Sequence, residues 1–204
     1  MTDIETKEKI LEVARVLFAD HGYEGTSVRE IAKAAEVNVA SVNYYFSSKE
    51  NLFLEILKAG YVQCSEEIRA LMEKNQGVLE ETMVDIFRYF VENSHDLRSH
   101  FKLMMSAQHS HHLTSEGTED RMYGPPGGMI VAECLKKHAP HASEEDIHWA
   151  LKTIFSHATH LSLIHSCCLK TNQDIPFSDQ GYLEKSVRRL TRMVLNELKD
   201  PQHS

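Results

Sequence analysis

Long apolar runs are missing from this sequence. No stretch approaches the roughly 18 consecutive apolar residues that a membrane-spanning helix needs. The first segment, MTDIETKEKILEVARVLF, alternates charged with apolar residues and lacks the continuous apolar core of a secretory signal peptide. We therefore expect a cytoplasmic protein without a membrane partner.

Cysteines are few, and their spacing does not suit cross-linking. None of the four, Cys64, Cys134, Cys167 and Cys168, forms a C-x-x-C pair. The last two are adjacent, and neighbouring cysteines rarely meet the geometry of a disulfide with each other. The pattern excludes a disulfide framework and a recognisable zinc finger. We expect reduced, mostly buried thiols and no cofactor.

Positive charge is scarce as well. The net charge is −8, which by itself argues against a nucleic-acid partner. The segment 25–49 differs, because its basic residues (Arg29, Lys33, Lys49) outnumber its acidic ones (Glu30, Glu36). Any binding to DNA must therefore rest on few ion pairs and on two sites that act together in a dimer.

Strand patterns, repeats and low-complexity segments are also absent, whereas helical periodicity extends along the chain. We therefore predict an all-α protein. Capping boxes predict three helix starts, at Ser27 with Glu30, Ser47 with Glu50, and Ser143 with Asp146. Other helices are expected near 78–93, 96–112 and 128–138, from Ser143 to about Leu169, and from Ser178 to Lys199.

The best domain boundary lies in the helix that begins near Ser48. It separates a small N-terminal domain, residues 1–48, from a larger helical domain, residues 49–204. Gly22 marks the end of the first helix, since glycine accepts the left-handed conformation that follows a helix.

The segment VREIAKAAEVNVASVNYYF, residues 28–46, predicts two short helices joined by a turn at Val37. Such helices bury little surface alone, so they should pack against the helix that carries Leu17 and Phe18. This is the spacing of a helix-turn-helix, whose second helix enters the major groove of DNA. Periodicity alone leaves a plain helical hairpin open. The inner faces are formed by Ile31, Ala32 and Ala35, and by Val42 and Tyr45.

A composite pattern decides between these interpretations. The pattern lies in the segment ILEVARVLFADHGYEGTSVREIAKAAEVNVASVNYYFSSKENLF. This segment contains a helix ending F…G, then T-[TS]-hydrophobic-x-x-I-A and a turn. A short helix ending in aromatic residues and the motif S-K-E-x-L follow. From about Thr6 to Leu57 the chain resembles the N-terminal domain of the TetR family of transcriptional regulators. Its NYYF end, residues 43–46, is most similar to family members that read NYYF or NYHF. Glu36 stands where the family often has glycine.

The resemblance implies a DNA-binding surface around the second short helix. Tyr45 and Phe46 should turn inward, whereas Tyr44 should meet the sugar-phosphate backbone. The family usually has tyrosine where Asn43 stands, so which tyrosine makes that contact stays open. We expect phosphate contacts from Lys49 and from backbone N–H groups near Ser27 and Ser47. The expected DNA-binding residues are Thr26, Ser27, Arg29, Asn38, Val39, Ala40, Ser41, Asn43, Tyr44 and Lys49.

The resemblance also implies that the C-terminal domain binds a small effector and forms a homodimer. The long helix that begins at Ser143 is apolar over a broader arc than one neighbour covers, and the last helix carries one apolar stripe. Together they should form a two-fold four-helix interface with a second chain. The alternative is that one chain buries both faces of the long helix. The expected interface residues are Ala150, Ile154, Ala158, Leu161, Leu183, Val187, Leu190 and Val194. The expected pocket residues are the bulky apolar Met83, Phe87, Phe101, Met104, Met105 and Phe155, with His157 and His160 as polar contacts.

Thirteen histidines leave a rival interpretation open. His109, His111 and His112 cluster, and Cys134 lies four residues before His138, so a metal-responsive regulator or a helical metalloenzyme is conceivable. No H-E-x-x-H, di-iron pattern or nucleophile–base constellation occurs. We therefore expect no metal site, no enzyme, and a repressor that a small molecule releases from a palindromic DNA operator.

Overall fold

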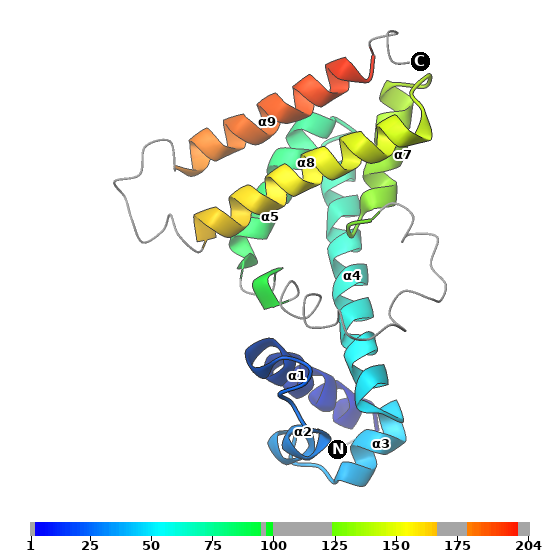
Figure 1. The fold of residues 1–204 in the computed structure, drawn as a ribbon, viewed down its shortest axis with the longest axis vertical. Coiled ribbons are helices and arrows are strands. Elements are labelled where there is room, and N and C mark those ends of the chain that lie inside the picture. Colours follow the sequence, from blue (N-terminus) through cyan, green and yellow to red (C-terminus); the bar gives the residue numbers. More distant parts are fainter. Residues whose placement is uncertain (1–2, 95–96, 100–123, 167–178, 200–204) are drawn as a thin grey trace. The chain divides into compact units, whose positions relative to one another are not determined.

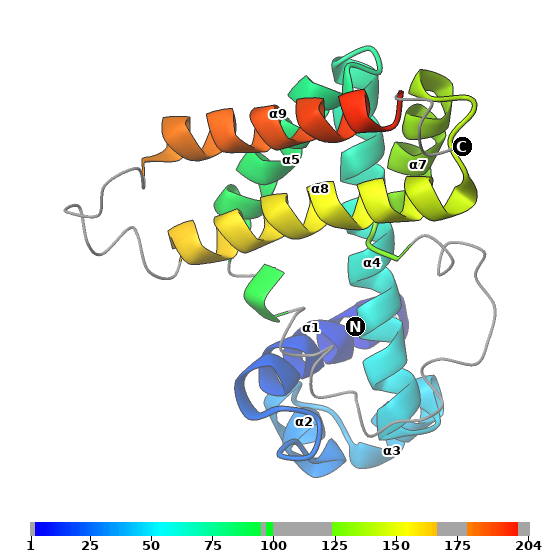
Figure 2. The ribbon, with the colours of Figure 1, turned by 45° about the horizontal axis from the view of Figure 1, so that its top comes forward.

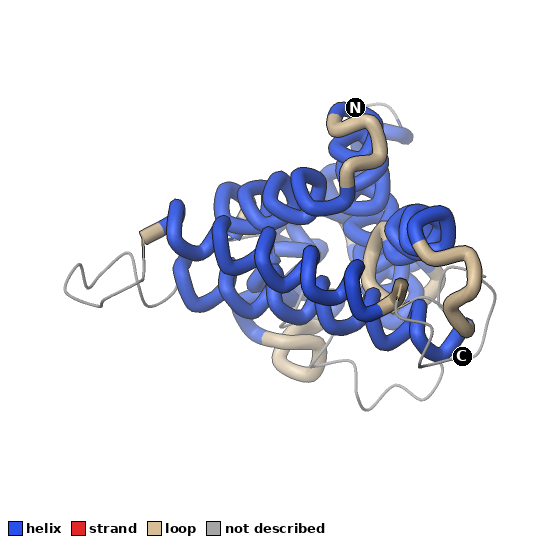
Figure 3. The backbone as a smooth tube through the Cα atoms, turned by 90° about the horizontal axis from the view of Figure 1, so that it is seen from above, coloured by secondary structure: helices blue, strands red, loops and turns tan. Residues whose placement is uncertain are grey.

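The computed structural model describes residues 3–94, 97–99, 124–166 and 179–199. These ranges contain helices and loops and no strand, which confirms the predicted all-α class (Figures 1 and 3). None of the described helices is long and apolar enough to cross a membrane. The helices are α1 (Asp3–His21), α2 (Val28–Ala34), α3 (Val39–Phe46), α4 (Lys49–Lys74), α5 (Leu79–Glu92), α7 (Gly128–His138), α8 (Glu144–Ile164) and α9 (Gln180–Glu197).

The helices form two compact units, and α4 contributes to both. In the described residues, the first unit comprises α1, α2, α3 and α4 as far as Val62, with residues 97–99, and the second comprises α4 from Gln63 with α5, α7, α8 and α9. The change of unit thus falls inside α4, the helix in which the sequence placed the boundary. The division into domains 1–48 and 49–204 stays a prediction.

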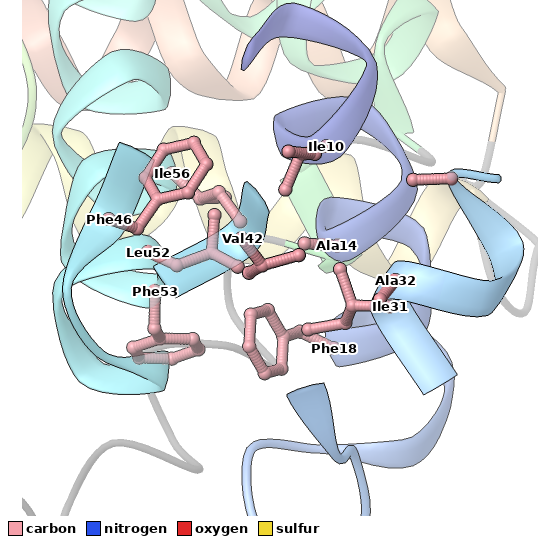
Figure 4. Close-up of a cluster of buried hydrophobic side chains, with 11 residues drawn as sticks. Ile10, Ala14, Phe18, Ile31, Ala32, Val42, Phe46, Leu52, Phe53 and Ile56 are labelled. Atoms are coloured by element: carbon pink, nitrogen blue, oxygen red, sulfur yellow. The ribbon is translucent and has the colours of Figure 1, made fainter. Parts of the chain in front are cut away.

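The first unit is built around one apolar cluster that joins all four of its helices (Figure 4). Phe18 from α1 and Phe53 from α4 are both fully buried, and their rings meet edge to face with centroids 5.1 Å apart. Burying a side chain of this size stabilises a fold by about 1.5–3 kcal/mol. The other buried members are Ile10, Ala14, Ile31, Ala32, Ala35, Val42, Phe46, Leu52 and Ile56.

The connection between α1 and α2 depends on two glycines for different reasons. α1 ends at His21, and Gly22 follows with φ +76°, as the sequence predicted. A Cβ on Gly25 would lie 2.3 Å from the carbonyl oxygen of His21, so only glycine fits there. The buried Thr26 hydroxyl lies 2.8 Å from the Gly22 carbonyl oxygen and closes the turn.

The second unit packs α5 against both α8 and α9, which run side by side in opposite directions (Figures 1 and 2). Ion pairs join the rims of α5 and α9: Arg88 to Glu184, Arg188 to Glu81, and Arg192 to Glu80. Burial alone would raise the pKa of Asp85, yet hydrogen bonds from Lys74, Asn75 and Arg88 outweigh it and lower that pKa.

Two of the three predicted capping boxes are confirmed, at Ser27 with Glu30 and at Ser143 with Asp146. The third was wrong by one residue, because the hydroxyl of Ser48, not Ser47, accepts the Asn51 N–H at the start of α4. Ser47 instead ends α3 with φ 62°. Most of the helix expected near 96–112 lies outside the described residues, as does the expected end near Leu169.

Candidate nucleic-acid interface

The turn between α2 and α3 holds a glutamate where a left-handed backbone is required. Glu36 has φ 57°, a conformation that costs most residues on the order of 1 kcal/mol. Its carboxylate accepts a hydrogen bond from Lys9 on α1, 2.7 Å away, and this bond and the charge of Lys9 lower the pKa of Glu36. The turn therefore forms without glycine and is tied to α1.

One side of α3 is buried in the apolar cluster, and the other side is open. Val42 and Phe46 are 1% and 3% exposed, which fixes the helix by its inner side. Asn38 caps the start of α3, where its side chain accepts the Ala40 N–H. The open side presents a mixture of small, amide and aromatic groups, the types that read base edges and backbone. It comprises Asn38, Val39, Ala40, Asn43 and Tyr44, with Ser41 half-buried beside them.

The three adjacent rings at the end of α3 have different surroundings. Tyr44 is 77% exposed, Phe46 is buried, and Tyr45 is half-buried against the cluster. The Tyr45 hydroxyl donates a hydrogen bond to Asp3 at 2.9 Å, and this bond, with the charge of Asp3, raises the pKa of Tyr45. These positions agree with the inward and outward directions predicted for the rings.

Lys49 has intramolecular partners that the sequence did not reveal. Its ammonium donates to the carbonyl oxygens of Tyr23 at 3.0 Å and Thr26 at 3.2 Å, and it lies 4.2 Å from the centre of the Tyr23 ring. An ammonium has three N–H donors, so two of them fasten the start of α4 to the α1–α2 loop. The phosphate contact expected of Lys49 stays a prediction.

Polar groups at the start of α2 also have hydrogen-bond partners within the protein. The Ser27 N–H donates to the Glu30 carboxylate at 2.8 Å, which completes the capping box. Thr26 is 1% exposed and lies beneath the surface. Arg29 and Lys33 are exposed on α2, so they are the cations of this segment that lie most open to a phosphate. The assigned contacts of Thr26, Ser27 and Arg29 with DNA stay predictions.

The residues assigned to an effector pocket fall into two groups. Met83, Phe87 and Phe155 are 0%, 0% and 4% exposed and belong to the core where α5 packs on α8. His157 and His160 instead line a shallow groove between α8 and α9, where His157 Nε2 lies 3.1 Å from the Ser186 hydroxyl. Phe101, Met104 and Met105 lie outside the described residues. The pocket stays a prediction.

Most residues assigned to the dimer interface are covered within one chain. Leu161 and Leu190 are half-buried, and the other six are at most 5% exposed: Ala150, Ile154, Ala158, Leu183, Val187 and Val194. Other residues of the same two helices are exposed, Trp149 by 47% and Met193 by 57%. The sequence pattern showed that α8 is apolar over a broad arc and α9 along one stripe, but it did not show which side their own domain covers. The interface stays a prediction.

Metal-ligating side chains are dispersed in the described part of the chain, where no group of three or more His, Cys, Asp or Glu residues converges. Cys134 Sγ lies 3.7 Å from His138 Nδ1, and burial raises the pKa of the Cys134 thiol. Burial, helped by Glu67, raises the pKa of Cys64 to about 11. Both thiols are therefore protonated at neutral pH. His109, His111, His112, Cys167 and Cys168 lie outside the described residues.

This geometry defines a helix-turn-helix domain of the DNA-binding type. The family model for bacterial regulatory proteins of the tetR family matches residues 10–56, and these residues form a TetR-family helix-turn-helix domain. The HTH-type transcriptional regulator YttP of Bacillus subtilis (strain 168) is 38% identical over 91 residues, which cover 42% of this chain and 44% of that protein.

Two further comparisons extend this result. The HTH-type transcriptional repressor AcnR of Corynebacterium glutamicum is 36% identical over 78 residues, covering 37% of this chain and 42% of that protein. The chain thus spans less than half the length of these curated relatives. A solved TetR-family transcription regulator from Shewanella sp. PV-4 superposes with a TM-score of 0.66 at 17% identity, covering 94% of this chain and 97% of that one, which shows the same fold.

Replacing Lys49 tests whether it mainly holds the fold. Lys49→Met removes a charged donor from two carbonyl oxygens, and we expect it to destabilise the first unit by about 1–3 kcal/mol. The measurement is amide hydrogen exchange in α2 and α3. Lys33→Met, which removes the same charge from an exposed site, is the control and should leave exchange unchanged. Equal exchange in the two variants would contradict the structural role of Lys49.

Proposed function

We propose that this chain is a DNA-binding transcriptional regulator without enzymatic activity that acts in the cytoplasm. The observation that carries the proposal is the open side of α3, from Asn38 to Tyr44, held outward by the burial of Val42 and Phe46. Asn43 and Ser41 offer hydrogen bonds to base edges, and Val39 and Ala40 offer apolar contact to thymine methyl groups. We assign the backbone contact to Tyr44 because its ring is exposed.

The regulator is proposed to act as a homodimer on a palindromic operator, because two recognition helices related by two-fold symmetry read two half-sites. The outer side of α8 and α9 is the surface that a second copy would cover. Their antiparallel course brings Trp149 and Met193 to the same end of the pair, and the half-buried Leu190 lines the adjoining groove.

Release from the operator is proposed to follow binding of a small molecule in the second unit. Repression is the proposed sign of regulation, as the name of AcnR states for that relative. Met83, Phe87 and Phe155 are adaptable apolar side chains that could repack around a ligand. Such a ligand shifts the operator-competent population only if it binds one conformation more tightly than the other.

Specific DNA binding can be measured with a palindromic duplex selected from a random library. We expect the protein to bind this duplex about 10³-fold or more tightly than random duplex, with a shallow salt dependence because few cations face the DNA. Tyr44→Phe should weaken both duplexes alike, since it removes a backbone contact. Equal affinity for selected and random duplexes at every salt concentration would refute the proposed operator binding.

The dimer surface can be tested by adding charge to it. Trp149→Glu and Met193→Glu should each give monomers in sedimentation at micromolar concentration, because a carboxylate cannot be buried cheaply without a partner. Val62→Glu, at a position 53% exposed on α4, is the matched control and should stay dimeric. Dimers in both test variants would show that another surface makes the contact.

A further inference from the structure

The first turn of α1 contacts the last turn of α3, although 42 residues separate them in sequence. The Tyr45 hydroxyl donates to Asp3 Oδ1 at 2.9 Å. The same phenol oxygen takes part in a hydrogen bond with the Thr6 side chain. The bond to Asp3 therefore ties the tip of the Tyr45 ring to α1.

This fixed ring lies between a buried ring and an exposed one. Tyr45 is tilted by 58° against Phe46, which is 3% exposed, with centroids 6.3 Å apart. Tyr45 also meets Tyr44 edge to face, at an interplanar angle of 77° with ring centroids 5.1 Å apart. Tyr44 is 77% exposed and has no burial of its own to orient it. The ring of Tyr45 is thus the aromatic surface against which Tyr44 rests.

We propose that Asp3, assisted by Thr6, is a positioning residue of the DNA interface that orients Tyr44 through Tyr45. This inference rests on the proposed function, since holding Tyr44 in one orientation raises affinity only when DNA binds. A side chain ordered in advance loses less conformational freedom on binding. For a single tyrosine this advantage corresponds to an affinity gain of about 2- to 10-fold.

The negative charge of Asp3 is expected to lower the affinity for DNA, whereas its hydrogen bond to Tyr45 is expected to raise it. A negative charge beside a residue that meets DNA repels phosphate and lowers affinity. Asp3→Asn keeps an acceptor for the Tyr45 hydroxyl and removes the charge, so it should bind DNA more tightly than the natural protein. Asp3→Ala removes both, so comparison of the Asn and Ala variants isolates the hydrogen bond at constant charge.

The test is a double-mutant cycle with full-length protein and a duplex selected from a random library. We expect Asp3→Asn to bind about 2- to 10-fold more tightly than Asp3→Ala, and this ratio to fall to one when Tyr45→Phe is added to both. Such non-additivity shows that Asp3 acts through Tyr45. A ratio of one with Tyr45 present, or a ratio that persists with Tyr45→Phe, would overturn the proposal.

A second measurement needs no DNA and therefore separates this proposal from the proposed function. The ring signals of Tyr44 in NMR report the ring current of Tyr45, whose centroid lies 5.1 Å away. Asp3→Ala should shift these signals toward those of an unstructured tyrosine, whereas Asp3→Asn should leave them in place. Unchanged Tyr44 signals in Asp3→Ala would overturn the positioning role even if DNA binding were specific. If no variant prefers the selected duplex, the proposed function fails instead.

Discussion

The position of α3, the proposed recognition helix, depends on one apolar cluster. α3 has eight residues and α2 has seven, and helices shorter than about 12 residues are marginal in water by themselves. Both exist because Ile31, Val42 and Phe46 are buried against α1 and α4, around the edge-to-face contact of Phe18 with Phe53. The face of α3 that is left open is determined by which face this cluster covers.

Polar contacts then hold the connections that precede and follow α2. Lys9 holds the turn at Glu36, and Lys49 holds the loop at Tyr23 and Thr26. These bonds attach each connection around α2 and α3 to a longer helix. The few cations of this segment are therefore partly used within the fold, which leaves Arg29 and Lys33 as the exposed ones. Affinity for DNA must then depend more on the geometry of α3 than on charge.

Local signals in the sequence predicted much of this architecture. The Ser27–Glu30 box, the stop at Gly22 and the helical periodicity of residues 28–46 act over a few residues, so they can be read without a structure. The bonds of Tyr45 to Asp3 and of Lys49 to Tyr23 join residues 42 and 26 positions apart, and no local pattern encodes them.

The second unit shows a different limit of sequence reasoning. Apolar spacing predicted that α8 is covered on more than one side, and the structure shows Ala150 and Val187 covered within the chain. The spacing of apolar residues shows which faces of a helix are apolar, but it does not show which other helices cover those faces. The exposure of Trp149 and Met193 became known only from the structure.

In the proposed function, the open face of α3 reads base pairs, whereas its buried face only holds the helix in place. The most direct measurement is selection of duplexes from a random library by the natural protein and by the double variant Ser41→Ala/Asn43→Ala. Both side chains lie at least partly in the open, so the variant should keep its thermal stability. We expect the selected base preference to change or disappear at particular positions. Selection of the same sequence with the same strength would contradict it.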